Sequence, residues 1–213
     1  DSLFRRYESA MRAAEDSLFG CVSADGGIYA IRAALMPHVP GDVTDDFYVS
    51  TAAVAAGQRI AFAPAARVYE HSIAGDRPQF RRRVRITVRG LTGLWRRRAL
   101  MNPLRTGWYA VALVFHKVAR RLAPLALPPL WVLSGVLALG GHLLPWGLVF
   151  AGLTAAVALG IIGFLKPVRL PKPLAVAYGA VLHLAGLSLG AILFLSGRRY
   201  SQWTPQKSSE PSA

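Results

Sequence analysis

WGLVFAGLTAAVALGIIGFL, residues 146–165, is a run of twenty residues without a charged side chain. A helix of about 20 apolar residues is long enough to cross the hydrocarbon core of a bilayer. Two similar stretches lie on either side of it, residues 122–144 and 174–196, and prolines interrupt only the start of the first. The sequence therefore predicts about three transmembrane helices within residues 122–197, followed by a polar tail, residues 198–213.

The net charge of +14 is concentrated in the middle of the chain. Residues 1–76 carry six Arg and ten Asp or Glu, a net charge of −4, whereas residues 77–121 carry thirteen Arg or Lys and no acid. A basic segment beside apolar spans is attracted to anionic lipid headgroups. Nucleic acid is the competing partner for such a charge block. The adjoining spans favour membrane lipids and argue against a nucleic-acid partner.

Residues 1–76 show the alternation of an α/β domain. Apolar periodicity and turn residues predict, in order, a helix at 3–19, a strand at 28–31, a helix at 45–56 and a strand at 59–63. Thr44 precedes the second helix, where its hydroxyl could accept a hydrogen bond from a free backbone N–H, and Gly57 follows it.

Two amphipathic helices at the membrane surface are predicted in the basic segment, residues 77–121. In the first, residues 77–100, apolar residues recur at helical spacing between arginines, and a tryptophan is present. This composition is typical of helices that lie in the interface plane. The second helix is expected at about 107–121.

The distribution of Lys and Arg predicts the orientation of the chain. Basic loops stay in the cytoplasm, which places residues 1–121 and the loop 166–173 on that side. Three crossings would then put the basic tail, with Arg198, Arg199 and Lys207, on the opposite side. Either one apolar stretch is re-entrant or the tail departs from the rule, and the sequence does not decide between them.

The motif Thr44-Asp45-Asp46 is the one concentrated acidic feature of the N-terminal region. Carboxylates are common in the first turn of a helix, because the helix dipole stabilises negative charge there. A carboxylate in such a position can also remove a proton from a reacting hydroxyl group. Taken alone, the motif favours a purely structural role at the start of the helix. Whether it also has a catalytic role is therefore judged from the neighbouring segments.

Six segments, in order along the chain, resemble the inverting family 2 glycosyltransferases of the GT-A fold, the group that contains cellulose, hyaluronan, chitin and poly-N-acetylglucosamine synthases. The segments are Glu15–Gly20 (EDSLFG), Gly26–Arg32 (GGIYAIR), Asp45–Phe47 (DDF), Arg59–Ala66 (RIAFAPAA) with Glu70, and the basic runs Phe80–Ile86 (FRRRVRI) and His116–Pro124 (HKVARRLAP). The resemblance covers most of the chain. It implies the C-terminal, acceptor-side part of a GT-A domain at residues 1–76, in a multi-pass protein of the bacterial inner membrane with its catalytic part in the cytoplasm.

The resemblance also implies roles for particular residues. Asp46 would be the general base that deprotonates the acceptor hydroxyl group, and Asp45 would hold the acceptor or tune the pKa of Asp46. Thr44, Asp25, Gly26 and Gly27 would lie at the acceptor site, where glycines let the backbone approach a sugar closely. Arg82, Arg83 and Arg85 would bind the donor diphosphate through guanidinium hydrogen bonds. Arg82 and Ile86 replace the family's Gln and Trp at this motif, which argues against the synthesis of long polymers.

The expected reaction transfers a sugar from a nucleotide-sugar donor to a glycan or lipid-linked acceptor, with inversion. The family holds Mg²⁺ or Mn²⁺ with an Asp-x-Asp motif that does not occur in this sequence, so no metal ligand is assigned here. The nucleotide-binding and metal-binding half is expected to precede this sequence, and the chain alone is expected to be inactive. The alternative is a non-catalytic membrane anchor or scaffold. A transporter half is disfavoured, since no span contains an acidic residue.

Overall fold

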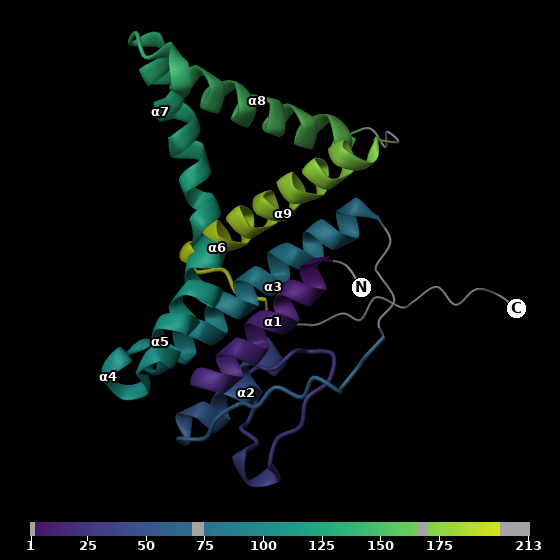
Figure 1. Ribbon diagram of the computed structural model, residues 1–213, viewed down its shortest axis with the longest axis vertical. Helices are drawn as coiled ribbons and strands as arrows, with labels where there is room; N and C mark the ends of the chain where they lie inside the picture. The colour runs from purple at the N-terminus through teal and green to yellow at the C-terminus, as the bar shows by residue number, and fades with distance from the viewer. Residues whose placement is uncertain (1–2, 70–74, 166–169, 201–213) are drawn as a thin grey trace, which may run out of the picture.

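The computed structural model describes residues 3–69, 75–165 and 170–200, and the regular secondary structure in these ranges is helical (Figure 1). The first part contains α1 (Leu3–Leu18), the 3₁₀ turn η1 (Ala33–Leu35), α2 (Asp45–Ala55), α3 (Asp76–Arg96), the 3₁₀ turn η2 (Arg98–Met101) and α4 (Pro103–Thr106). A continuous helical stretch then comprises α5 (Trp108–Leu113), the π-helical η3 (Val114–Ala119), α6 (Arg120–Leu122), the 3₁₀ segment η4 (Ala123–Ala126) and α7 (Leu127–Leu139). Two long helices, α8 (Leu143–Leu165) and α9 (Lys172–Leu195), complete the fold.

The strands predicted at 28–31 and 59–63 do not form. Around them the described residues contain one isolated bridge, between Asp25 and Ile28, and a hydrogen bond of 2.8 Å from the Cys21 amide to the Ile60 carbonyl. An extended segment becomes a strand only when a second extended segment forms hydrogen bonds with its successive backbone N–H and C=O groups. An apolar run indicates extended backbone but does not supply that neighbour. The prediction of an α/β sheet is therefore wrong for the described residues, which contain helices joined by extended loops.

Helix α2 begins directly after Thr44 and ends just before Gly57, as the sequence predicts. Gly57 has a φ of 75°, a left-handed conformation that terminates helices readily. The predicted cap is only half correct, because Thr44 occupies the N-cap position but its hydroxyl makes no capping hydrogen bond. Asp45 and Asp46 both lie in the first turn.

Three helical stretches are long and apolar enough to cross a membrane, which confirms the prediction of membrane helices: Trp108–Leu139, Leu143–Leu165 and Lys172–Leu195. Figure 1 shows α7, α8 and α9 as the three sides of an open triangle. Between α7 and α8, the Trp131 indole donates a hydrogen bond of 2.9 Å to Thr154 and stacks on Phe150, with ring centroids 5.7 Å apart.

The base of this triangle is a pair of helices, because α3 runs beside α9 (Figure 1). The Tyr178 hydroxyl donates a hydrogen bond of 3.0 Å to Asp76 at one end of the pair. Further along, a Cβ atom on Gly190 would lie 2.6 Å from the Cβ of Thr87. Only glycine allows two helices to approach so closely.

One hydrophobic cluster joins the N-terminal region to the basic segment and to α9. Its buried members are Val22, Phe47, Leu91, Leu94, Leu100, Tyr109, Leu113 and Ala191. Val22 and Phe47, from the N-terminal region, therefore pack on side chains of α3 and α5, and this packing determines where the acidic motif of α2 faces.

Candidate functional site

The acidic motif lies at the junction between a loop and α2. Asp45 is exposed, whereas Asp46 is half-buried. Asp46 faces the turn at residues 25–27, since a Cβ atom on Gly26 would lie 3.4 Å from its Oδ2 atom. The structure thus brings the predicted acceptor turn and the predicted general base together.

The turn that faces Asp46 is fixed at both sides. Asp25 forms a salt bridge of 3.2 Å with Arg12 of α1, and it also accepts a hydrogen bond of 3.4 Å from the Gly27 amide. The Ala24 amide donates a hydrogen bond of 3.1 Å to Ser50 of α2. The turn is therefore held between α1 and α2, with Gly26 on the Asp46 side.

Two cations from η3 and α6 add positive charge near Asp46. Lys117 interacts electrostatically with Asp46, Arg121 and Glu15. Arg121 donates a hydrogen bond of 2.8 Å to the Lys117 carbonyl, and its guanidinium lies against Gly90 of α3. In the sequence, these residues are noticeable only as part of the family-like run His116–Pro124, and no role at the site was predicted for them.

The three arginines predicted to bind a diphosphate lie on α3, and they differ in exposure. Arg82 is exposed, while Arg83 and Arg85 are half-buried. Burial lowers the pKa of Arg83, and the charges of Arg82 and Arg120 lower it further. Burial likewise lowers the pKa of Arg85, with Arg89 and Arg82 as further causes. An anion bound beside these groups would relieve their mutual repulsion.

These arginines lie in one cationic group with α6 rather than in contact with the carboxylates. Arg120 interacts with both Arg83 and Arg121, and Arg121 interacts with Asp46. In the described part of the chain, no hydrogen bond or ion pair joins Arg82, Arg83 or Arg85 to Asp45 or Asp46. We call the group formed by Arg82, Arg83, Arg85, Lys117, Arg120 and Arg121 the cationic row.

Three other arginines of the basic segment hold the chain around α2. Arg89 donates two hydrogen bonds to the Val43 carbonyl, one of them 2.8 Å long. Arg96 pairs with Asp42 through both carboxylate oxygens, at 2.9 and 2.8 Å, and this hydrogen bonding raises the pKa of Arg96. Arg97 lies over the Tyr48 ring at 4.2 Å. These contacts fix the N-terminus of α2, and the charge pattern of the sequence did not distinguish them from headgroup contacts.

A second set of contacts joins α1 to the helix that leads into the membrane region. Glu15 is buried, and its carboxylate lies 2.6 Å from Nδ1 of His116. The same carboxylate accepts a hydrogen bond of 3.2 Å from the Val22 amide. The Tyr109 hydroxyl donates a hydrogen bond of 2.8 Å to the Val22 carbonyl. The neighbouring Cys21 is buried, and burial, with Glu15 and Asp16 as further causes, raises the pKa of its thiol to about 11.

The ligand set of a metal ion does not occur within residues 3–69, 75–165 and 170–200, where no three His, Cys, Asp or Glu side chains come together. No described residue is therefore assigned to Mg²⁺ or Mn²⁺. Glu70 of the family-like segment lies outside the described residues.

Comparisons with protein-family models, with curated proteins and with solved structures gave no match. The function is therefore argued from the site itself.

Proposed function

We propose that this chain provides the acceptor side of a membrane glycosyltransferase. The observation that carries the proposal is the position of Asp46, a half-buried carboxylate beside the glycine turn at Gly26 and close to the cations Lys117 and Arg121. A general base needs access to a substrate hydroxyl, and a departing phosphate needs positive charge. Asp46 can take the proton, and Lys117 and Arg121, which interact with it electrostatically, can supply the positive charge.

In the proposed reaction, the acceptor lies along the turn and presents a hydroxyl group to Asp46. The carboxylate takes the proton while the hydroxyl oxygen bonds to the anomeric carbon of the donor sugar. The bond from that carbon to the diphosphate oxygen breaks, and its electron pair leaves with the nucleoside diphosphate. Displacement from the opposite face inverts the configuration. The cationic row would stabilise the negative charge of the leaving group.

The remainder of the enzyme belongs to the same proposal. The donor is a nucleotide sugar, the acceptor is a glycan or a lipid-linked sugar, and the site is expected on the cytoplasmic face of a bacterial inner membrane. Mg²⁺ or Mn²⁺, when bound in the full-length enzyme, would neutralise charge on the donor diphosphate. The described residues bind and orient the acceptor and hold the proton at Asp46.

The test compares Asp46→Asn with Asp45→Asn in the full-length membrane protein. Release of nucleoside diphosphate from a panel of nucleotide sugars would be measured in detergent or nanodiscs. Asp46→Asn should lower turnover by a factor of about 10² to 10⁴ and leave nucleotide binding nearly unchanged, since only proton removal is lost. Asp45→Asn, at an exposed position, should have the smaller effect. Near wild-type turnover in Asp46→Asn would overturn the assignment, and absence of nucleotide release from every donor would favour the scaffold instead.

A further inference from the structure

Helices α3 and α9 run in the same direction, side by side. Three contacts show this, because the residue numbers rise in the same order on both helices: Tyr178 contacts Asp76, Gly186 contacts Arg83, and Gly190 contacts Thr87. At the middle contact a Cβ atom on Gly186 would lie 3.3–3.4 Å from the aliphatic carbons of Arg83. Over about 11 residues, or roughly 16 Å, α9 therefore lies at the same height as the arginine-rich part of α3.

This pairing is incompatible with α9 crossing the bilayer. If α9 stood across the membrane, α3 would lie at the same depth and carry its arginines into the hydrocarbon. Charged side chains at that depth are costly and are usually paired with an opposite charge. Beyond Asp76, however, α3 has no acidic residue. The arginines concerned are Arg77, Arg81, Arg82, Arg83 and Arg85.

Both ends of α9 lie at the basic segment. Near its start, Phe164 at the end of α8 packs on Phe80 of α3 at 6.0 Å, and Arg77 lies over the same Phe164 ring at 5.6 Å. Near its end, α9 contacts α6 and η4, and Ala191 joins the cluster that contains Tyr109 and Leu113. Helix α9 therefore connects the end of α8 to the beginning of α7, along the base of the triangle in Figure 1.

Helices α7 and α8 differ from α9, because neither lies along the arginine-rich helix. They carry no charged side chain and meet at the loop 140–142. Their apolar side chains are widely exposed, Leu139 and Leu148 among them. The backbone of α8 is non-helical at Leu144, and the continuous helix that follows, residues 145–165, extends roughly 31 Å at about 1.5 Å per residue, which matches a bilayer core of about 30 Å.

We propose that the described chain crosses the membrane only twice, through α7 and through α8, and that α9 lies with α3 in the surface of the lipid monolayer. Lipid acyl chains then cover the exposed apolar face of α9. This face includes Val176, Ile192 and Leu195, which are 74%, 52% and 66% exposed. The basic residues of α3 supply the complementary charge for anionic headgroups.

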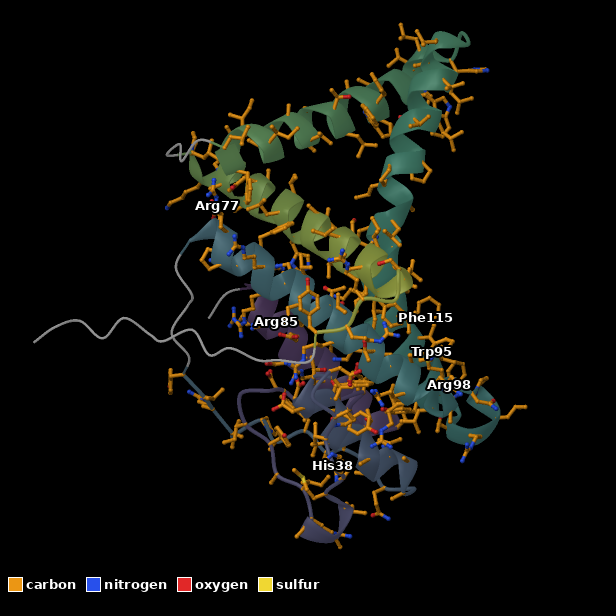
Figure 2. All side chains as sticks on the ribbon, turned by 180° about the vertical axis from the view of Figure 1, so that it is seen from behind. His38, Arg77, Arg85, Trp95, Arg98 and Phe115 are labelled. Atoms are coloured by element: carbon orange, nitrogen blue, oxygen red, sulfur yellow. The ribbon has the colours of Figure 1, made fainter. Side chains whose placement is uncertain are left out.

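The exposed aromatic residues fit the same orientation. Figure 2 shows Trp95 and Phe115 beside Arg98 at one end of the α3–α5 region. Trp95, Trp108 and Phe115 are all exposed. Tryptophan rings in particular are favoured at headgroup depth. These side chains would mark the level of the interface at that end of the molecule.

Two crossings also remove the conflict in the charge distribution. The basic residues at the two ends of α9, Lys172 at its start and Arg198 and Arg199 just after its end, then lie on the side of the basic segment, as the positive-inside rule requires. This inference does not depend on the proposed enzymatic activity.

The test uses single exposed cysteines in the full chain, expressed in spheroplasts and treated with a membrane-impermeant maleimide. The variants are Ser17→Cys, His142→Cys and Ser196→Cys, and the unchanged chain with its buried Cys21 is the background control. We expect His142→Cys to react in intact spheroplasts. Ser17→Cys and Ser196→Cys should react only after permeabilisation. If Ser196→Cys reacts from the same side as His142→Cys, or if all three share one side, the proposal is overturned.

A second measurement tests the pairing itself in the membrane. The Cβ positions at Arg83 and Gly186 are 3.4 Å apart, close to the roughly 3.5–4.5 Å that a disulfide requires. The double variant Arg83→Cys with Gly186→Cys should form a disulfide under mild oxidation. The control pair, Arg83→Cys with Gly179→Cys, should not, because nothing lies within 4 Å of a Cβ at Gly179. Failure of the first pair to cross-link more than the control would contradict the side-by-side arrangement.

Discussion

The carboxylate of Glu15 lies 2.6 Å from Nδ1 of His116 and is almost completely buried. It joins α1 to η3, and through η3 to the helix that continues into α7. It also accepts the Val22 amide hydrogen. One side chain therefore couples the N-terminal region to the membrane region.

Replacing Glu15 should destabilise this junction. Glu15→Ala leaves the Val22 amide and His116 without their partner, so the free energy of unfolding should fall by about 1–3 kcal/mol. Glu15→Gln retains a carbonyl oxygen and should cost less. The matched control is Glu8→Ala, since Glu8 is only half-buried and forms a longer pair, 3.6 Å, with Arg12 of the same helix, and such helical pairs contribute little. Denaturant titration in detergent measures all three, and equal effects at positions 8 and 15 would contradict the coupling.

The space between Gly26 and Asp46 should be sensitive to side-chain size. A methyl group at Gly26 would lie 3.4 Å from Asp46 Oδ2, a tight but tolerable contact. Gly26→Ala should therefore have little effect on transfer. Gly26→Val places two further carbons where the acceptor must approach and should lower turnover about tenfold, equivalent to about 1.4 kcal/mol. Turnover and nucleotide affinity should be measured for both variants. Equal turnover in the two would show that the acceptor does not pass this turn.

The sequence predicted the helices well and their partners poorly. The start of α2 after Thr44 and its end before Gly57 follow from local chemistry, namely the carboxylates of the first helical turn and the left-handed conformation of Gly57, although the Thr44 hydroxyl makes no capping hydrogen bond. The predicted strands failed because strand formation depends on a second chain segment, which no local pattern supplies. Lys117 and Arg121 were not assigned to the site for the same reason. Their proximity to Asp46 arises from the packing of α5 and η3 on the N-terminal region, and is not encoded in any short motif.

Arg97 and Arg98 should have different functions, Arg97 in stabilising the fold and Arg98 in binding the membrane surface. Arg97 lies over Tyr48 and donates a hydrogen bond to its carbonyl, whereas Arg98 is exposed beside the exposed Trp95. Arg98→Ala should lower partitioning onto anionic liposomes without changing the denaturation midpoint. Arg97→Ala should lower the midpoint and leave partitioning nearly unchanged. The contribution of Arg98 should also decline with added salt, because exposed charges are screened over about 8 Å at physiological ionic strength.

Cys21 should be unreactive in the folded chain. Its thiol is buried and its pKa is raised to about 11, so the reactive thiolate is scarce between pH 7 and 9. Labelling with a thiol reagent at pH 8 should be slow in detergent and rapid after denaturation. The shift has a consequence for stability, because the folded state retains its proton at a pH where the unfolded state, with the ordinary thiol pKa of 9.0, has lost it. This contribution is complete below about pH 9 and is lost as the pH rises towards 11.

Arg85 should affect nucleotide binding, and Arg81, an exposed neighbour on the same helix, should not. Burial and two neighbouring arginines lower the pKa of Arg85, so an incoming diphosphate would find a partly desolvated cation whose charge is not yet neutralised. Arg85→Ala should weaken nucleoside diphosphate affinity by a factor of about 10 to 100 in the full-length enzyme, in line with the loss of one charge-assisted hydrogen bond of about 1.5–3 kcal/mol. Arg81→Ala should reduce only the partitioning onto anionic liposomes. Titration calorimetry and liposome sedimentation on both variants distinguish the two roles. If Arg85→Ala, like Arg81→Ala, lowers liposome binding and leaves nucleotide affinity unchanged, the arginines of α3 bind the lipid surface and the diphosphate is bound elsewhere.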